Sequence, residues 1–237
     1  MDQVGRKRYR KCNVGLHRPS EIMTLSRLHI GVFVALAAMT WAAVLLIQGQ
    51  PITFELAAPF GIVVSVLTVF WLVVEHWLWH QSLLHGWFFN RPDLRGTWKG
   101  VLQSDWIDPA TNAPIAPIVC YFGIKQSLGT LQMNLMTPQS ESWLKGGSLK
   151  ESPNEILFQI VAVYENRPGL VFRDKSPMHR GAVAIETHGP DALRPSAISG
   201  EYWTDRKTKG TLEFDSRIDE THTRFKDAEM AFLKAMR

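Results

Sequence analysis

The stretch 199–211 carries the residues best suited to bind an anionic ligand. It reads Ser-Gly-Glu-Tyr-Trp-Thr-Asp-Arg-Lys-Thr-Lys-Gly-Thr and is typical of a polar hairpin. Because side chains alternate across a strand, Tyr202 and Thr204 should share one face. The tyrosine ring can stack on a nucleobase, the threonine hydroxyl can bond a phosphate, and Arg206 and Lys209 can supply positive charge. An ordinary solvated turn would have the same composition.

Three more residues are candidates with a competing structural interpretation. Trp98 begins the first expected strand, where an indole more often closes one end of a small barrel than contacts a ligand. Tyr121 and Lys125 share one face of the second expected strand. The other face of that strand is the more obvious core, so both side chains can simply point to water; that core face consists of Ile118, Cys120, Phe122 and Ile124.

The sequence contains no recognisable catalytic or metal-binding motif. Its eight histidines form no His-Glu-x-x-His pair and no cluster with Cys at metal-ligand spacing. A phosphate-binding glycine loop and a Gly-x-Ser-x-Gly elbow are also missing. The two cysteines, Cys12 and Cys120, suggest a reducing compartment rather than a disulfide framework. We therefore expect a ligand-binding protein that is not an enzyme and that needs no metal or cofactor.

Two long apolar runs without a charged residue, 30–47 and 57–74, indicate a membrane-anchored chain. A helix of roughly 20 apolar residues crosses a bilayer, so both runs are long enough. They predict a two-helix transmembrane hairpin over residues 30–79, followed by a membrane-proximal segment over residues 80–91. Because these runs must be buried in lipid, a freely soluble protein is excluded.

The charge of the N-terminal tail predicts the orientation of this hairpin. Residues 1–29 hold seven Lys or Arg and two acidic residues. Positive residues next to a membrane helix are retained in the cytoplasm, and two spans return the chain to the same side. We expect an inner-membrane protein with both termini cytoplasmic.

The remaining sequence predicts an all-β domain over residues 92–214. Short β-type runs are separated by Gly, Pro, Asn and Asp turn signals, which favours antiparallel neighbours. Eight strands can form a sandwich or a closed up-and-down barrel, and we favour a lipocalin-like barrel because it leaves no unpaired edge. Residues 215–237 predict an amphipathic helix. The eight expected strands are 96–104, 117–126, 130–136, 140–149, 156–164, 180–188, 197–205 and 209–214.

The order of these elements and two short motifs resemble a known family. The domain opens with Asp-Leu-Arg-Gly-Thr-Trp at 93–98 and closes with Gly-Glu-Tyr-Trp-Thr-Asp-Arg-x-Thr-x-Gly-Thr-Leu at 200–212. Together with two preceding membrane helices, they look like the two-transmembrane β-barrel effectors of bacterial anti-phage signalling, the CD-NTase-associated protein 15 (Cap15) family.

This resemblance implies an effector of CBASS defence. A partner CD-NTase cyclase would make a 3′,3′-linked cyclic dinucleotide, which the barrel would bind. The receptor would then oligomerise in the inner membrane and disrupt the bilayer, causing abortive cell death. The motif positions that carry over are Trp98, Tyr202, Thr204 and Arg206. The alternatives are a membrane-anchored, lipocalin-like carrier of a small apolar ligand, a membrane-bound hydrolase and a scaffold without a ligand.

Overall fold

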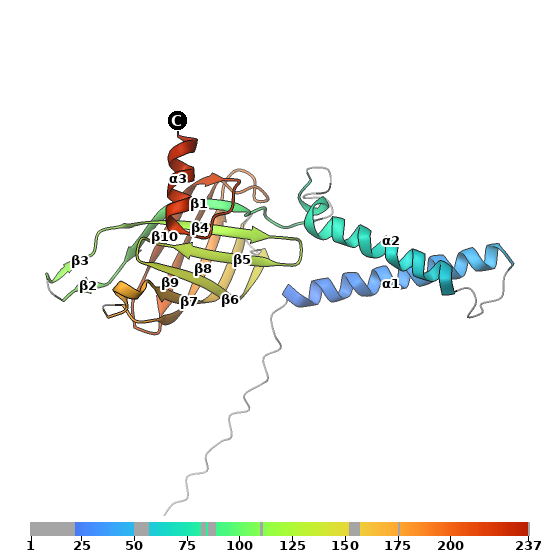
Figure 1. The fold of residues 1–237 in the computed structure, drawn as a ribbon, viewed down its shortest axis with the longest axis horizontal. Coiled ribbons are helices and arrows are strands. Elements are labelled where there is room, and N and C mark those ends of the chain that lie inside the picture. Colours follow the sequence, from blue (N-terminus) through green and yellow to red (C-terminus); the bar gives the residue numbers. More distant parts are fainter. Residues whose placement is uncertain are drawn as a thin grey trace, which may run out of the picture.

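The computed structural model describes residues 22–49, 57–81, 84, 89–109, 111–151, 157–174 and 176–236. Two long helices lie side by side at one end of a β-barrel, and a short helix packs on the barrel's side (Figure 1). The long helices are α1 (Ile22–Ile47) and α2 (Ala57–His76), followed by a short 3-10 helix, η2 (Leu78–His80). Outside the described residues lie much of the predicted basic tail (1–21), most of the turn between the helices (50–56), and residues 82–83 and 85–88 of the membrane-proximal segment.

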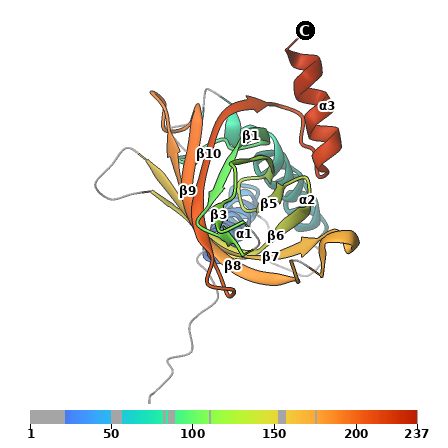
Figure 2. The same cartoon turned by 90° about the vertical axis from the view of Figure 1, so that its left-hand side faces the viewer.

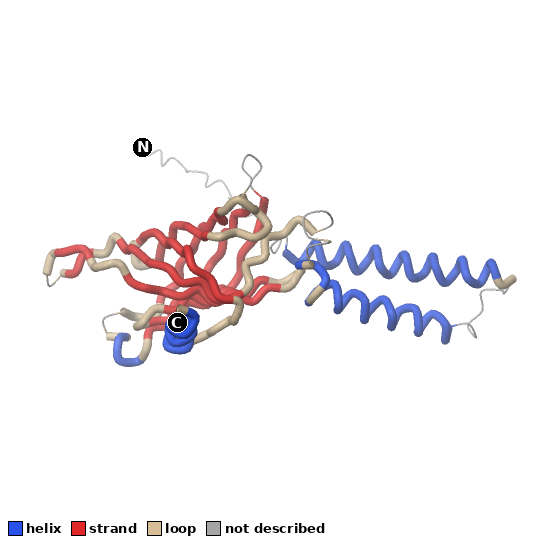
Figure 3. The backbone as a smooth tube through the Cα atoms, turned by 90° about the horizontal axis from the view of Figure 1, so that it is seen from above, coloured by secondary structure: helices blue, strands red, loops and turns tan. Residues whose placement is uncertain are grey.

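Helices α1 and α2 coincide with the two apolar runs and pair as a hairpin (Figure 3). Their hydroxyl side chains bond to their own backbone: Thr40 Oγ1 donates to the Leu36 carbonyl and Thr68 Oγ1 to the Val64 carbonyl, both at 2.8 Å. Counted over the residues that the structure describes, no helix combines the length and the apolarity needed to cross a membrane.

Eight antiparallel strands close into an up-and-down barrel, which confirms the predicted fold of this domain. Each strand pairs with the next along the chain, and the last pairs with the first. The antiparallel order follows from the short turns, because a parallel neighbour would need a long crossover. The strands are β1 (Gly96–Ser104), β4 (Ile118–Gln126), β5 (Leu131–Met136), β6 (Ser140–Glu151), β7 (Phe158–Pro168), β8 (His179–His188), β9 (Ala197–Thr204) and β10 (Lys209–Ile218).

Two features outside the eight strands were not predicted. Between β1 and β4 the chain forms a separate two-stranded ribbon, β2 (Ile107–Asp108) and β3 (Ala113–Pro114), at the barrel end remote from the long helices. Between β7 and β8 it forms a 3-10 helix, η3 (Leu170–Phe172). Both features border the same end of the barrel.

The helix-side end of the barrel is filled by apolar side chains. Trp98 on β1 is completely buried there, and its indole Nε1 donates to the Leu94 carbonyl at 3.0 Å. From the rim of the barrel, the Arg217 guanidinium lies over the indole, 5.2 Å from the ring centroid. The other fully buried side chains of this floor come from different strands; they are Ile124, Ile160, Ile185, Ile198 and Phe214.

The end of α2 is tied to the β4–β5 turn by Glu75. Its carboxylate Oε1 accepts hydrogen bonds from Ser127 Oγ at 2.6 Å and from the Gly129 amide at 2.8 Å. The Leu128 amide donates to the Glu75 carbonyl at 3.0 Å. Beside these bonds, Val74, Trp79 and Leu128 form a small buried cluster. These contacts between the end of α2 and the β4–β5 turn therefore couple the helix pair directly to the barrel.

The terminal helix is shorter than predicted. Residues 215–218 continue β10, and 216–218 of them pair with β1, so the helix α3 (Phe225–Ala235) begins about ten residues later than expected. The connecting segment crosses β1, where Thr97 Oγ1 donates to the Glu220 carbonyl at 2.7 Å. As expected from its amphipathic pattern, α3 packs on the barrel, where Ala228 and Phe232 are buried against Tyr121 and Met136.

Replacing Trp98 tests the role of the floor. Trp98→Ala should lower the free energy of unfolding by about 3–5 kcal/mol, because it leaves a cavity in a closely packed region. The measurement is urea denaturation of the full chain in detergent, followed by circular dichroism. Trp203→Ala, on a strand residue that is 48% exposed, should cost less than about 1 kcal/mol. An equal loss of unfolding free energy in the two variants would contradict the structural role of Trp98 in the floor.

Candidate functional site

A cavity of about 980 Å³ occupies the half of the barrel remote from the long helices. Figure 2 views the molecule towards this end. The volume lies at the upper end of the range found for small-molecule sites, which is about 300–1,000 Å³. Its lining comes from every strand of the barrel, from the β2–β3 ribbon and from η3. The cavity is therefore large enough for a dinucleotide-sized ligand.

The cavity has an apolar lower wall and a polar upper wall. The lower wall lies next to the packed floor; it consists of Leu102, Phe122, Met133, Leu135, Leu144, Val183 and Leu212. The upper wall offers hydroxyl, amide and imidazole groups, from Ser104, Thr137, Gln139, Ser140, Ser142, Tyr164, Asn166, Ser176, His179, Tyr202, Thr204 and Thr208. Of the described residues that line the cavity, Arg206 alone is a lysine or arginine.

Two tyrosines lie on neighbouring parts of the wall where glycines make room for their rings. Tyr164 on β7 lies opposite Gly181 on β8, and a Cβ atom at Gly181 would collide with the Tyr164 ring. Gly210 on β10 is likewise too close to the Tyr202 ring to carry a side chain. Burial raises the pKa of both phenols, although a hydrogen bond to Ser104 offsets part of this for Tyr202. Both are neutral hydroxyls at pH 7, able to donate hydrogen bonds.

The β9–β10 turn positions the Arg206 side chain. Thr204 Oγ1 lies 2.8 Å from Thr208 Oγ1 and accepts a hydrogen bond from the Arg206 amide at 3.2 Å. Lys207 has a φ of 65°, which closes the turn. The Arg206 guanidinium donates to Ser176 Oγ at 3.1 Å, from the segment that follows η3. This contact fixes a cation at the mouth of the cavity.

A histidine and an asparagine complete the polar wall near Arg206. His179 Nδ1 lies 3.1 Å from the Pro177 carbonyl and 3.4 Å from Asn166 Nδ2, and Asn166 Oδ1 accepts a hydrogen bond from Ser142 Oγ at 2.9 Å. Burial lowers the pKa of His179, and the charge of Arg206 lowers it further, while the Pro177 carbonyl acts in the opposite direction. The cavity lining thus combines the Arg206 cation with neutral hydrogen-bonding groups, and the β2–β3 ribbon adds one carboxylate, Asp108.

The structure brings three of the predicted site residues together in this cavity. Tyr202, Thr204 and Arg206 all line it. Trp98 does not: it is buried in the floor, in the structural role that the sequence also allowed. Lys209 does not line the cavity either. Leu212 and Phe214 point inward on β10, so Lys209, an odd number of residues away from them, faces solvent.

Tyr121 and Lys125 do not line the cavity, in agreement with the alternative in which the other face of their strand forms the core. On β4 the inward face carries Cys120, Phe122 and Ile124, so the residues between them face outward. Tyr121 is covered by α3, with its ring 5.1 Å from that of Phe225. Its position under a helix leaves it without access to the cavity.

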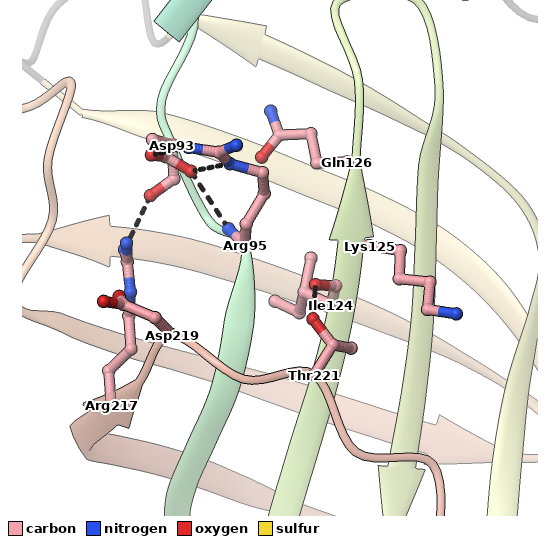
Figure 4. Close-up of a pocket in the computed structure, with 8 residues that line it drawn as sticks. All are labelled: Asp93, Arg95, Ile124, Lys125, Gln126, Arg217, Asp219 and Thr221. Carbon is pink, nitrogen blue, oxygen red and sulfur yellow. Dashed lines mark hydrogen bonds and ion pairs between the residues drawn. The ribbon is translucent and has the colours of Figure 1, made fainter. Parts of the chain in front are cut away.

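Lys125 borders a separate pocket of about 410 Å³ on the outside of the barrel (Figure 4). In this pocket the Arg95 side chain forms a two-bond ion pair with Asp93, each bond 2.8 Å long. Arg217 donates to the Asp93 backbone carbonyl at 2.8 Å. The Lys125 amine points away from this pair in the figure. Two carboxylates, those of Asp93 and Asp219, offset part of the positive charge of this pocket.

Several cavity residues were missed from the sequence. Strand β7 runs four residues beyond the end that was predicted for it, Tyr164. Continuing the inward and outward alternation by two residues would have identified Asn166. His179 precedes the predicted start of β8 by one residue. Trp106, at the entrance to the unpredicted ribbon, carried no signal. Among the described residues, no three His, Cys, Asp or Glu side chains are placed to hold a metal ion.

Comparison with known proteins agrees with this geometry. The family described as "Cap15, cyclic dinucleotide receptor domain" matches residues 89–216, which is more than half of the chain and includes the whole barrel except the end of β10. The comparison with curated proteins gives no match. The family match, together with the closed barrel and its cavity at one end, shows that the chain belongs to the Cap15 family and carries its cyclic dinucleotide receptor domain.

Proposed function

We propose that this protein is a CBASS effector that binds a 3′,3′-cyclic dinucleotide in the barrel cavity. The observation that carries the proposal is the combination, in one cavity, of the Tyr202 ring, the Arg206 guanidinium and a wall of neutral donors. A cyclic dinucleotide presents flat bases and two phosphate charges. Aromatic rings provide stacking surfaces for bases, and charge-assisted hydrogen bonds hold phosphates.

The charge of the cavity favours a ligand of low charge. Arg206 is the one lysine or arginine among the described lining residues, and His179 is neutral at pH 7. A buried phosphate that meets neither a cation nor hydrogen-bond donors is costly. The carboxylate of Asp108 also lines the cavity, so the lining has no excess of positive side chains. Arg206 with several hydroxyl and amide groups therefore suits a dianionic cyclic dinucleotide better than a nucleoside triphosphate, which carries about twice the charge.

The proposal includes anchorage in the bacterial inner membrane. The two charge-free runs and the basic tail of the sequence support a two-pass hairpin with cytoplasmic termini. On this proposal a partner CD-NTase cyclase makes the ligand during infection. Ligand binding leads to oligomerisation, disruption of the membrane and abortive cell death. The hydrogen bonds between Glu75 and the β4–β5 turn would connect the barrel to the second span.

The apolar lower wall supports one alternative, a membrane-anchored carrier of a small apolar ligand. Its leucines, together with Phe122 and Met133, resemble a lipid-binding surface more than a nucleotide site. Fatty acids and cyclic dinucleotides should be compared in a thermal-shift assay of the full chain. Stabilisation by fatty acids alone would favour the carrier.

Substitutions at Tyr202 and Arg206 test the nucleotide site. Loss of one stacking platform costs about 1–3 kcal/mol, so Tyr202→Ala should weaken binding on the order of 5- to 150-fold. Arg206→Gln should weaken it by a similar factor, because hydrogen bonds to charged groups contribute about 1.5–3 kcal/mol. Calorimetry of the full chain in detergent, with a panel of 3′,3′-cyclic dinucleotides, measures both effects. Lys209→Gln, which changes an outward lysine three residues away, should bind as the wild type does. Unchanged affinity in both site variants would contradict the site.

The two native cysteines allow a direct test of topology. Cys120 is fully buried, and burial raises the pKa of its thiol to about 12, so it should not react with maleimides. A membrane-impermeant maleimide should label Cys12 in spheroplasts only after permeabilisation. In a Cys12→Ser background, Gln48→Cys at the end of α1 should be labelled in intact spheroplasts. Labelling of Cys12 from outside would place the N-terminal tail outside the cytoplasm.

A further inference from the structure

An apolar patch covers the outer surface of β7, β8 and β9. Val161 and Val163 on β7 are 43% and 51% exposed, and Trp203 on β9 is 48% exposed. In the strand register, Val163 lies beside Ala182 and Ala182 beside Trp203, while Val161 lies beside Ala184. All five side chains thus face outward as one surface. A continuous exposed apolar patch with a polar border is a usual mark of a protein interface.

The border of this patch on the cavity side carries charges of alternating sign. Glu165 on β7 is paired in register with Arg180 on β8. Beyond Glu165 lies Lys145 of β6, whose Nζ is 3.9 Å from Glu165 Oε1. Beyond Arg180 lies Asp205, whose Oδ2 accepts a hydrogen bond from the Arg180 amide at 3.1 Å. Glu165 Oε1 also accepts a hydrogen bond from Arg167 Nε at 2.7 Å, and the β6 residue in register with Glu165 is Trp143. With Lys145 beside Trp143, the charges from β6 to the end of β9 alternate: positive, negative, positive, negative.

This order is self-complementary under a two-fold rotation. We consider a two-fold axis that runs parallel to the strands and passes between β7 and β8. Rotation about this axis gives a second copy in which the charged side chains follow one another in the opposite order. Glu165 then faces Arg180 of the second copy, and Asp205 of the second copy faces Trp143 and the neighbouring Lys145. In a two-fold dimer both copies use the same surface, and each contact between two residues occurs twice. Such a surface must therefore carry charges that are opposite at positions related by the axis. We propose that the patch is a contact between two copies of this chain, related by this axis.

The apolar rows fit the same rotation. Across β6 to β9, one row of neighbouring residues runs from Gly146 through Val163 and Ala182 to Trp203. The rotation reverses this row, so the Trp203 indole lies over Gly146 of the second copy. Nothing lies within 4 Å of the position that a Cβ atom would occupy at Gly146, so there is room for a large ring. Val161 meets Ala184 of the second copy. A large side chain thus faces the smallest residue, and no like charges oppose each other in these rows.

The inference rests on the proposed function, because it names the surface through which the receptor would oligomerise. The axis runs along the strands, so the ends of both barrels that carry α1 and α2 point to the same side. A patch of four strands is small for a stable interface in solution. Confinement in one membrane raises the effective concentration of the partner and makes such a contact effective.

Cross-linking in membranes tests the surface. In the full-length chain with Cys12→Ser, Val163→Cys places one reactive thiol beside the proposed axis. A bis-maleimide spanning about 10 Å, the usual separation of packed sheets, should join two copies. Val119→Cys is the matched control, since Val119 on β4 is 44% exposed and lies away from the patch. Cross-linking is measured with and without an equal mixture of 3′,3′-cyclic di-AMP, cyclic di-GMP and cyclic GMP–AMP.

Charge reversal then tests the two-fold pairing. In the Val163→Cys chain, Glu165→Arg or Arg180→Glu alone should reduce the cross-linked fraction about tenfold, because each change opposes like charges at two symmetric places. The double variant should recover the wild-type fraction. Cross-linking of Val119→Cys equal to that of Val163→Cys, or no effect of the single reversals, would overturn the proposal. If no chain binds the nucleotides in calorimetry, the proposed function fails, while the cross-linking pattern still decides the surface.

Discussion

The closed barrel imposes one constraint on which the rest of the structure depends: every strand residue faces either the interior or the surroundings. With eight strands the interior is just wide enough to be filled by side chains or to hold one small ligand. Which of these happens is decided by the sizes of the inward residues. Near the helices they are large, with Trp98 and Phe214 completely buried. Towards the other end, inward glycines such as Gly181 and Gly210 leave space beside two tyrosines.

This gradient in side-chain size also separates stability from binding. The floor stabilises the fold by burying apolar side chains. The polar atom of the Trp98 side chain, its indole Nε1, donates a hydrogen bond to the Leu94 carbonyl. The upper wall contributes little buried apolar surface and many groups that can bond a ligand. Binding groups that are placed outside the main core can be substituted without removing the contacts that hold the barrel closed. For that reason Arg206, which is exposed, is suited to functional tests, whereas Tyr202 also packs against the core and its variant needs a stability control.

The strands and their order could be predicted from the sequence, because alternation and turn residues are local signals. Which face of a strand points inward was clear where one face is polar, as on β9 with Tyr202 and Thr204. On β4 the core face of Cys120, Phe122 and Ile124 was also predicted, but the burial of Tyr121 was not, because the helix that covers it is more than a hundred residues away in the chain. Strand ends were equally hard to predict, because Asn166 and His179 lie where pairing continues past the last apolar residue. The contact between Glu75 and the β4–β5 turn depends on tertiary packing alone.

If the proposed function and the proposed contact between copies both hold, strand β9 would physically connect ligand binding with assembly. A ligand changes an oligomeric equilibrium only if it binds the assembled and the free states with different affinity. Tyr202 and Thr204 line the cavity, while Trp203 between them belongs to the outer patch, so a ligand that orders this strand also orders the patch. Ordering the patch before contact reduces the entropy lost when two copies associate. The coupling requires no large movement of the barrel, since the same few residues of backbone carry both surfaces.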